Sequence, residues 1–392
     1  MERRHDLDWV RVCAFGLLVF FHVGMYYVTW DWHVKSPHAS GLAEPLMLLS
    51  APWRLALLFL VSGVATSFLL RKGDKGFLGK RSWRLLVPLI FGMLVIVPPQ
   101  SYYEVVEKIP GGYFDGYLAF WSRYLQADPG FCRGTECLDL PTWNHLWYVI
   151  YLWAYTATLW LLVRFMPNAM RKLGSSLSRA LDGVGILVWP AVLLALVRMT
   201  MFGPFGSTHG LVDDWYNHAQ YFSMFLLGFL IASAEPVWKS MQRYRWTALS
   251  LALSGWVLLN LYYSTYSSVD PPEILRQMQR ALWGVLEWSA IVAVMGFAGR
   301  HAPGDSPTLR YLSQAVFPVY ILHQTLIVVF AHNLKPFGIH PAIEAPLLIL
   351  ATFAACFGAY ELIRRIPWMR PLFGLKKRPA KRQGQAVQVA ST

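Results

Sequence analysis

The sequence predicts an all-α integral membrane protein, a polytopic bundle of about ten transmembrane helices with both termini in the cytoplasm. Of its 392 residues, 55% are hydrophobic and 15% are charged, whereas soluble domains are typically about 25% charged. Apolar stretches of about 20 residues, long enough to cross a bilayer, recur along the chain. Basic residues gather in alternate loops, as they do on the cytoplasmic side of membrane proteins. This composition excludes an ordinary soluble enzyme.

The apolar stretches define the expected spans. They lie at 9–30, 44–70, 85–106, 143–163, 184–202, 217–234, 246–266, 280–299, 311–332 and 343–363. The first follows Arg3 and Arg4, as a signal peptide would. It is long, however, ends in aromatic residues and lacks a small-residue cleavage site, so we expect it to remain as a span.

The net charge of +13 follows this topology. Of the 35 Lys and Arg residues, 25 fall at the two ends of the chain and in alternate loops, 7 in the other loops, and 3 within spans. This asymmetry indicates cytoplasmic termini and an even number of spans, with no need for nucleic acid. We expect a transmembrane domain over 1–375 and a basic, disordered tail over 376–392 that is attracted to anionic lipid. A recognition role for the tail is the alternative.

The four cysteines do not form a disulfide framework, and no metal-type Cys/His cluster is visible, so we expect no metal. Cys132 and Cys137 lie in the longest outer loop, 107–142. An oxidising compartment would permit a disulfide between them, and two unpaired thiols are the alternative.

Ionisable side chains inside a membrane are costly, so each needs a partner, a polar cavity or a function. Five of them, on five spans, come to similar depths of about 15 to 21 Å from the cytoplasmic face at 1.5 Å per helical residue. They are His22, Arg54, Arg198, Glu287 and His323. The shared depth favours a polar cavity and, for the histidines, proton transfer. The alternative is a set of interhelical hydrogen bonds and ion pairs, such as Glu287 with Arg54 or Arg198.

Arg11 and His22 lie on one face of the first span. Eleven residues at 100° each give three turns plus about 20°, and about 16 Å along the axis. This spacing suits a long anionic donor whose phosphates bind at the inner surface while its reactive end reaches the imidazole.

Several short motifs occur in order along these spans. They are Arg11 and His22 separated by ten residues, followed by 58–63, 80–84 with Pro88, 144–148 and 320–324. Together they resemble the membrane-bound acyltransferase-3 family over about residues 5–375. Further segments at 53–55, 196–198 and 360–367 are similar to the subfamily that succinylates osmoregulated periplasmic glucans.

The resemblance implies an O-acyltransferase in a bacterial inner membrane. It would move a succinyl or acetyl group from cytoplasmic acyl-coenzyme A to a hydroxyl of an extracytoplasmic carbohydrate, with no permanently bound cofactor. We expect His22 to be the general base. Arg54 would stabilise the oxyanion or pair with a succinyl carboxylate. His323 would assist as a second acid or base, orient His22, or serve only as a structural hydrogen-bonding group.

The remaining candidates would bind the two substrates. Arg11, Lys80, Arg81 and Arg84 would hold the phosphates of coenzyme A. His145 and Trp147 would contact the sugar; the alternative for Trp147, and the one we favour, is a place in an interfacial aromatic belt. Arg198 and Glu287 are further substrate-binding candidates.

A proton-coupled secondary transporter is the competing function, because a polar layer in mid-membrane is typical of that class too. The sequence leaves open the acyl group, the acceptor and the oligomeric state.

Overall fold

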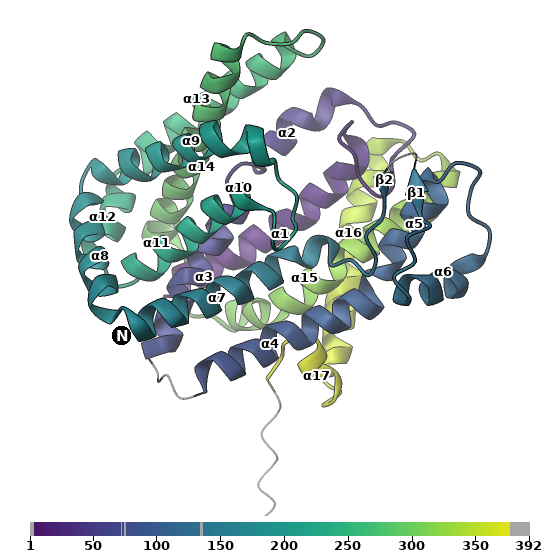
Figure 1. Cartoon of the computed structure of the whole chain (residues 1–392), viewed down its shortest axis with the longest axis horizontal. Helices are drawn as coiled ribbons and strands as arrows, with labels where there is room; N and C mark the ends of the chain where they lie inside the picture. The colour runs from purple at the N-terminus through teal and green to yellow at the C-terminus, as the bar shows by residue number, and fades with distance from the viewer. Residues whose placement is uncertain (1–3, 72, 74–75, 134–135, 377–392) are drawn as a thin grey trace, which may run out of the picture.

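The computed structural model describes residues 4–71, 73, 76–133 and 136–376, and almost all of them are helical (Figure 1). The two strands in this part of the chain, β1 (Cys132–Arg133) and β2 (Glu136–Cys137), form one short antiparallel pair. This confirms the all-α class. The predicted basic tail lies outside the described residues, apart from Lys376.

Seventeen α-helices and five shorter 3₁₀ or π segments cover the described residues. The helices are α1 (His5–Tyr27), α2 (Glu44–Leu48), α3 (Arg54–Arg71), α4 (Phe77–Phe91), α5 (Pro98–Lys108), α6 (Gly116–Leu125), α7 (Trp147–Phe165), α8 (Pro167–Ala180), α9 (Gly185–Phe205), α10 (Trp215–Asn217), α11 (Ser223–Ile231), α12 (Glu235–Arg243), α13 (Arg245–Thr265), α14 (Glu273–His301), α15 (Pro307–Leu334), α16 (Pro341–Ile363) and α17 (Met369–Leu372). The short segments are η1 (Gly41–Ala43), η2 (Gly92–Ile96), η3 (Asn144–Leu146), η4 (His218–Phe222) and η5 (Lys335–Phe337).

Eight helices of the described chain are long and apolar enough to cross a membrane, so the protein is multi-pass. A ninth is obtained if Trp215–Ile231 counts as a span with α12, which bends away from it by 113°. The remaining predicted stretch, 246–266, is helical as α13 but does not meet the same test of length and apolar composition. Figure 1 shows the α13–α14 hairpin projecting beyond the other elements.

The first helix packs against four other helices. α1 packs against α3, α14, α15 and α16, so residues along its length face several other helices. Arg11 and His22, which share one face of α1, are therefore placed where neighbouring helices contribute to their surroundings.

Two glycines allow α3 and α11 to approach closely. A Cβ atom at Gly63 would lie 1.9 Å from the carbonyl oxygen of Phe225, and one at Gly228 would lie 2.0 Å from that of Leu60. No side chain fits at either position. Small residues of this kind let helix backbones pack together in membranes, and this contact explains why a glycine follows Ser62 in the second span.

The third span is interrupted. Helix α4 ends at Phe91, a π-helical segment (η2) follows, and α5 begins at Pro98, so Phe77–Lys108 forms one span with a π-helical segment inside it. A π-helix and a proline both change the direction of a helix. The first turn of α5, with Gln100, lies in the buried interior.

The connecting loops gather at two opposite ends. At one end, polar or cation–π contacts join Arg4 to Trp238, Ser240 to Asp182, Gln242 to Gly299 and Arg84 to Gly374. At the other, they join Lys108 to Asp31, Trp143 to His209, Trp256 to Pro45 and Lys335 to Glu107. Alternate loops of the chain therefore share an end.

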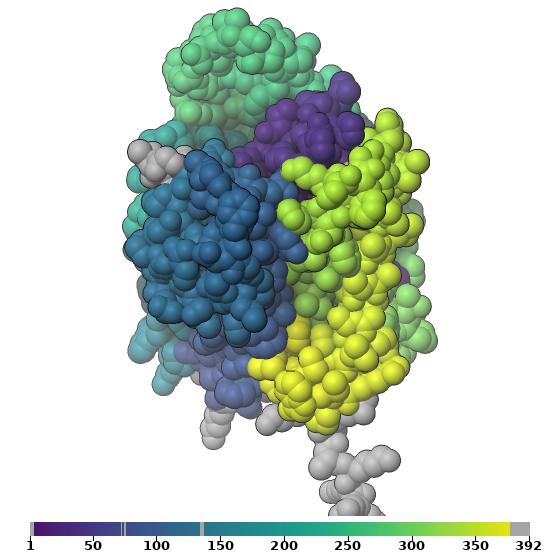
Figure 2. All heavy atoms as spheres, turned by 90° about the vertical axis from the view of Figure 1, so that its right-hand side faces the viewer, coloured from purple at the N-terminus to yellow at the C-terminus, as the bar shows by residue number. Residues whose placement is uncertain are grey.

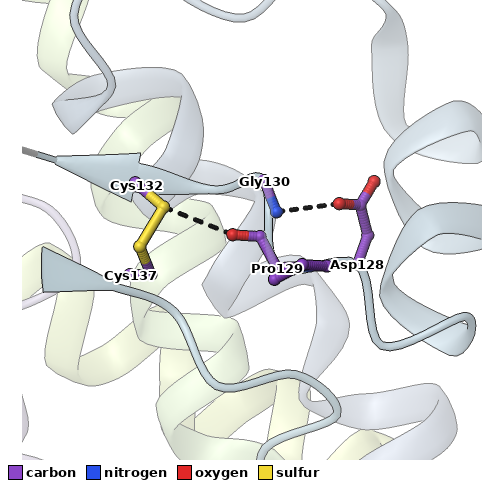
Figure 3. Close-up of a disulfide and its surroundings, with 5 residues drawn as sticks. All are labelled: Asp128, Pro129, Gly130, Cys132 and Cys137. Carbon is purple, nitrogen blue, oxygen red and sulfur yellow. Dashed lines mark hydrogen bonds between the residues drawn. A yellow bond between two sulfur atoms is a disulfide. The ribbon is translucent and has the colours of Figure 1, made fainter.

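Cys132 and Cys137 form a disulfide across the β1–β2 pair (Figure 3). The turn before it is held by the Asp128 carboxylate, which accepts a hydrogen bond from the Gly130 amide at 2.8 Å. Of the two possibilities that the sequence left open for these cysteines, the structure contains the bonded pair.

Candidate active site

The centre of the site is a pair of histidines from α1 and α15. His22 Nδ1 lies 2.9 Å from His323 Nε2, and His323 Nδ1 lies 2.6 Å from the carbonyl oxygen of Tyr320. Because a carbonyl oxygen only accepts, His323 carries its proton on Nδ1 and accepts at Nε2. His22 therefore donates from Nδ1 and has a free lone pair on Nε2. The hydrogen-bond network thus assigns the tautomer that a general base requires.

The two histidines differ in exposure. His323 is buried, with 1% of its surface exposed, whereas His22 is only partly buried. The indole of Trp32 stacks beside the His22 imidazole, with the rings nearly parallel and their centroids 6.4 Å apart. His22 is the accessible member of the pair, and His323 supports it from inside the bundle.

Arg54, at the start of α3, lies beside this pair. Its guanidinium covers the ring of Phe21 at 3.9 Å, and the Phe21 ring contacts that of His22. One Arg54 nitrogen donates to Ser50 Oγ at 3.0 Å, and Nε is buried without a hydrogen-bond partner in the described structure. A buried cation with an unused N–H group is suited to bind an anion. The structure thus brings together all three predicted catalytic residues.

His145 has protein partners on both ring nitrogens. Its Nε2 lies 3.2 Å from the carbonyl oxygens of both Tyr320 and Ile321, and its Nδ1 lies 3.3 Å from Gln100 Nε2. The Tyr320 hydroxyl in turn donates to the His145 carbonyl. Both ring nitrogens are therefore occupied by the protein, and neither is left for a sugar. Because the Tyr320 carbonyl also fixes His323, His145 is a positioning residue.

Gln100, which the sequence did not single out, organises this region. It is fully buried, donates to Thr325 Oγ1 at 2.6 Å and to His145, and accepts from Asn144 at 3.2 Å and Gln324 at 3.0 Å. All four hydrogen-bonding positions of its amide are used. The available signal was a buried amide within a predicted span, but only ionisable groups were considered there.

A second imidazole also lies near the pair. His33 Nδ1 is 2.5 Å from Glu104 Oε2, and Gln324 Nε2 is 3.1 Å from His33 Nε2. Lys108 completes the group by donating to the other Glu104 oxygen at 3.1 Å. The polar network thus extends from His145 through Gln100 and Gln324 to an ion-paired cluster on α5.

Trp147 lies in neither of its two predicted positions. Only 8% of it is exposed, and its ring packs against His209 at 4.4 Å, Tyr151 at 5.0 Å and Phe59 at 6.3 Å. It therefore belongs to the aromatic core and offers no open face to a pyranose ring. The loop that carries His209 folds over it, and that fold is invisible in the local sequence.

Arg198 and Glu287 have partners other than the histidine pair. Arg198 lies between the rings of Phe202 and Trp283, at 4.3 and 4.0 Å, and donates to the Tyr216 hydroxyl at 2.7 Å. Glu287 accepts from Gln220 at 2.7 Å. Their helices, α9 and α14, pack against each other. The expected single layer is thus divided between two groups of contacts, of which only one contains the histidines.

The predicted donor-binding residues lie at the opposite end of the molecule from the disulfide. Lys80, Arg81 and Arg84 line a cavity of about 630 Å³. Arg11 is outside that lining; its guanidinium lies 3.3 Å from the Ser313 carbonyl oxygen and 3.7 Å from the Asp8 carboxylate. Within the described residues, no group of three or more His, Cys, Asp or Glu side chains is placed to hold a metal.

The fold and the site define a multi-pass membrane protein that carries a hydrogen-bonded histidine pair suited to proton transfer. The chain belongs to the acyltransferase-3 family, since the family described as an acyltransferase domain matches residues 4–361. It is also similar to proteins named glucans biosynthesis protein C from Escherichia coli strains 536 and ED1a, with 22% identity over 391 residues, 96% of this chain and 95% of each relative. No solved structure matches it. The protein is therefore an acyltransferase, as its motifs predict.

Proposed function

We propose that this protein transfers an acyl group, succinyl or acetyl, from cytoplasmic acyl-coenzyme A to a hydroxyl of an extracytoplasmic carbohydrate such as a periplasmic glucan. The observation that carries the proposal is the His22–His323 pair, whose hydrogen bonds leave His22 Nε2 as a base. The acceptor is supported by the name of the E. coli relatives, and the membrane would be the bacterial inner membrane.

The chemical step balances without any further reactant. The acceptor oxygen attacks the thioester carbonyl carbon while its proton moves to His22 Nε2. The carbon–oxygen bond forms, the carbon–sulfur bond then breaks, and the proton passes from His22 to the departing thiolate of coenzyme A. His323 accepts the Nδ1–H hydrogen bond throughout and stabilises the transient imidazolium.

Arg54 would act on the charge that forms on the carbonyl oxygen. A donor already fixed near the reacting carbon stabilises an oxyanion without reorganisation, and the contacts with Ser50 and Phe21 hold this guanidinium in place. With a succinyl donor, Arg54 would instead pair with the free carboxylate. Both roles use the same buried cation.

The topology we propose has ten spans and cytoplasmic termini. It is supported by the sequence, in which 25 of the 35 basic residues fall at the two ends of the chain and in alternate loops. It is also supported by the 21-residue helix α13 beside α14 and by the disulfide, which an oxidising compartment would maintain. The cavity lined by Lys80, Arg81 and Arg84 would then open towards cytoplasmic coenzyme A.

The test is acyl transfer in proteoliposomes that contain the purified protein, succinyl- or acetyl-coenzyme A labelled in the acyl group, and a glucan acceptor. We expect label in the glucan for the wild type and a loss of about 10²- to 10⁴-fold for His22→Asn. His301→Asn, at the exposed end of α14, is the matched control and should keep full activity. A His22→Asn protein of normal abundance and full activity, or proton flux without label transfer in the wild type, would contradict the proposal.

A further inference from the structure

The cavity that contains Lys80, Arg81 and Arg84 has a second wall that the known motifs do not include. It is formed by the C-terminal segment 369–376, of which Pro371, Gly374, Leu375 and Lys376 face the cavity. Figure 2 shows the C-terminal part of the chain, in yellow, at the lower end of the molecule beside the third span, in blue, and α17 contacts α4 directly.

This segment is fixed in place by a glycine that no other residue can replace. Gly374 has a φ of +67°, which L side chains rarely adopt. A Cβ atom there would also lie 2.4 Å from the ring of Phe317. The Gly374 carbonyl accepts a hydrogen bond from Arg84 Nε at 3.2 Å, and the ring of Phe373 packs on that of Phe91 at 5.4 Å. The segment is therefore anchored to the third span rather than loosely placed beside it.

Arg370 then folds the chain back so that Lys376 reaches the cavity. Its Nε donates to the Lys376 carbonyl at 2.8 Å and its Nη1 to the Arg364 carbonyl at 2.7 Å. The Leu375 amide donates to the Arg370 carbonyl at 2.9 Å. With its backbone held in this turn, the exposed Lys376 lies among the lining residues.

The lining has the chemistry of a nucleotide site. Four of its side chains are cations, from Lys80, Arg81, Arg84 and Lys376, and no carboxylate is among the described lining residues. Arg81 Nε is buried and has no partner in the described structure. Trp83 adds an indole that is 61% exposed. Guanidinium groups bind phosphate oxygens, and an exposed aromatic ring stacks on a base.

We propose that the C-terminal segment 369–376 is part of the donor site, where Lys376 binds a phosphate and Trp83 stacks on the purine of the nucleotide portion of coenzyme A. This inference rests on the proposed function, because it takes the cavity to be the donor site. The cavity volume of about 630 Å³ lies within the usual range for small-molecule sites. The phosphate of an anionic lipid headgroup has the same chemistry, so the test includes both ligands.

The test compares binding and turnover for full-length wild type, Lys376→Gln and Trp83→Ala in nanodiscs. Calorimetry with coenzyme A should give Kd values raised about three- to tenfold for Lys376→Gln, the loss of one solvent-exposed charged contact, and about tenfold for Trp83→Ala. Turnover with an acyl-pantetheine thioester, which lacks the nucleotide, should not change in either variant. A purely structural defect would reduce both the affinity for coenzyme A and the turnover of the acyl-pantetheine thioester.

Two controls match the variants in side chain and exposure. Lys172→Gln removes an exposed lysine from α8, and Trp246→Ala removes an indole with the same 61% exposure as Trp83; both should bind coenzyme A like the wild type. Wild-type binding together with unchanged Kd values in Lys376→Gln and Trp83→Ala would overturn this inference alone. If Lys376→Gln and Trp83→Ala bind phosphatidylglycerol more weakly than the wild type does but keep the wild-type Kd for coenzyme A, the site binds a lipid headgroup and the inference is overturned. Failure of the wild type to bind coenzyme A would instead contradict the proposed donor.

Discussion

At the scale of single residues, the histidine pair depends on one backbone carbonyl. Tyr320 presents its oxygen to both His323 Nδ1 and His145 Nε2, so it fixes two tautomers at once. The sequence predicted His22 and His323 because an ionisable group in a span is conspicuous. It did not predict Tyr320 as a partner, since a carbonyl oxygen carries no signature in the residue type.

The role of His323 as acceptor predicts an order among its substitutions. His323→Gln keeps an oxygen that can accept the His22 Nδ1–H bond, whereas His323→Leu removes the acceptor and leaves that buried N–H unpaired. We expect His323→Gln to retain at least about tenfold more kcat than His323→Leu, with similar KM for the donor. Acyl-transfer kinetics at matched protein abundance measure this difference. Equal kcat values for the two variants would show that the hydrogen bond has no part in turnover.

Gln100 allows a second prediction at this scale. Gln100→Leu keeps the size of the side chain but leaves His145, Asn144 and Gln324 without their shared partner. Each buried group left unpaired costs about 1–3 kcal/mol, so we expect a lower Tm and a lower kcat. Thr325→Val removes one of the four Gln100 contacts and the hydrogen bond from Thr325 to the Ile96 carbonyl. It leaves the other three Gln100 contacts in place and should have the smaller effect in both thermal unfolding and activity. The interpretation fails if Thr325→Val is as damaging as Gln100→Leu.

At the scale of elements, the sequence located the helices better than it located their ends and bends. The third span was expected to begin at residue 85, but α4 begins at Phe77, so Lys80, Arg81 and Arg84 lie on a helix rather than in a loop. Polar residues in the first turns of a helix weaken the apolar signal that marks a span. The π-helical segment at 92–96 likewise follows from packing against neighbouring helices, which no local pattern contains.

The contact between α3 and α11 predicts a strong effect of one methyl group. Gly63→Ala places a Cβ atom 1.9 Å from the Phe225 carbonyl oxygen, so the two helices must separate. Overpacking of this kind costs about 1–3 kcal/mol. Gly358→Ala is the control, because a Cβ atom there has no neighbour within 4 Å. Thermal unfolding in detergent should show a lower Tm for Gly63→Ala only, and equal Tm values would contradict the close approach.

The loop after α1 is held by a partly buried lysine. Lys35 donates to the carbonyls of Met25 at 2.6 Å and Trp30 at 2.9 Å, and also to that of Val28. Burial lowers the pKa of Lys35 from its ordinary value, because the ammonium loses water. These bonds hold the loop whose Trp32 stacks on His22.

Lys35→Met should therefore lower both Tm and kcat, because it frees three carbonyl groups and the loop that carries Trp32. We expect a loss of stability of about 1–3 kcal/mol. The matched variant Lys239→Met removes a lysine whose side chain is 73% exposed, and it should change neither quantity. Unfolding curves and acyl-transfer rates measured on the same preparations provide the comparison. An unchanged kcat for Lys35→Met would show that the loop that carries Trp32 does not contribute to turnover.

At the scale of the whole molecule, the charge distribution and the grouping of loops describe the same two ends. The 25 basic residues that we assign to the cytoplasm include Arg4 and two residues of the short helix α12, Lys239 and Arg243. In the structure, Arg4 contacts Trp238 of α12. The sequence predicts which end is cytoplasmic because charge acts over whole loops. It did not show that Arg198 and Glu287 have partners other than the histidines. The depth of a residue along a span does not give the direction in which its side chain points.

The proposed topology predicts which thiols a membrane-impermeant reagent reaches. With the disulfide outside, an impermeant reductant followed by an impermeant maleimide should label Cys132 and Cys137 in intact spheroplasts, and omission of the reductant should prevent it. Cys13 and Cys356 lie within helices of the bundle, so Cys13→Ser/Cys356→Ser provides a background in which only the disulfide reports. A second variant in that background replaces the disulfide with Cys132→Ser/Cys137→Ser and adds Lys172→Cys on α8. Its single thiol should react with the maleimide only after permeabilisation, because α8 is assigned to the cytoplasm. If Lys172→Cys is labelled in intact spheroplasts and the reduced disulfide is not, the orientation is reversed, and the donor cavity would face away from coenzyme A.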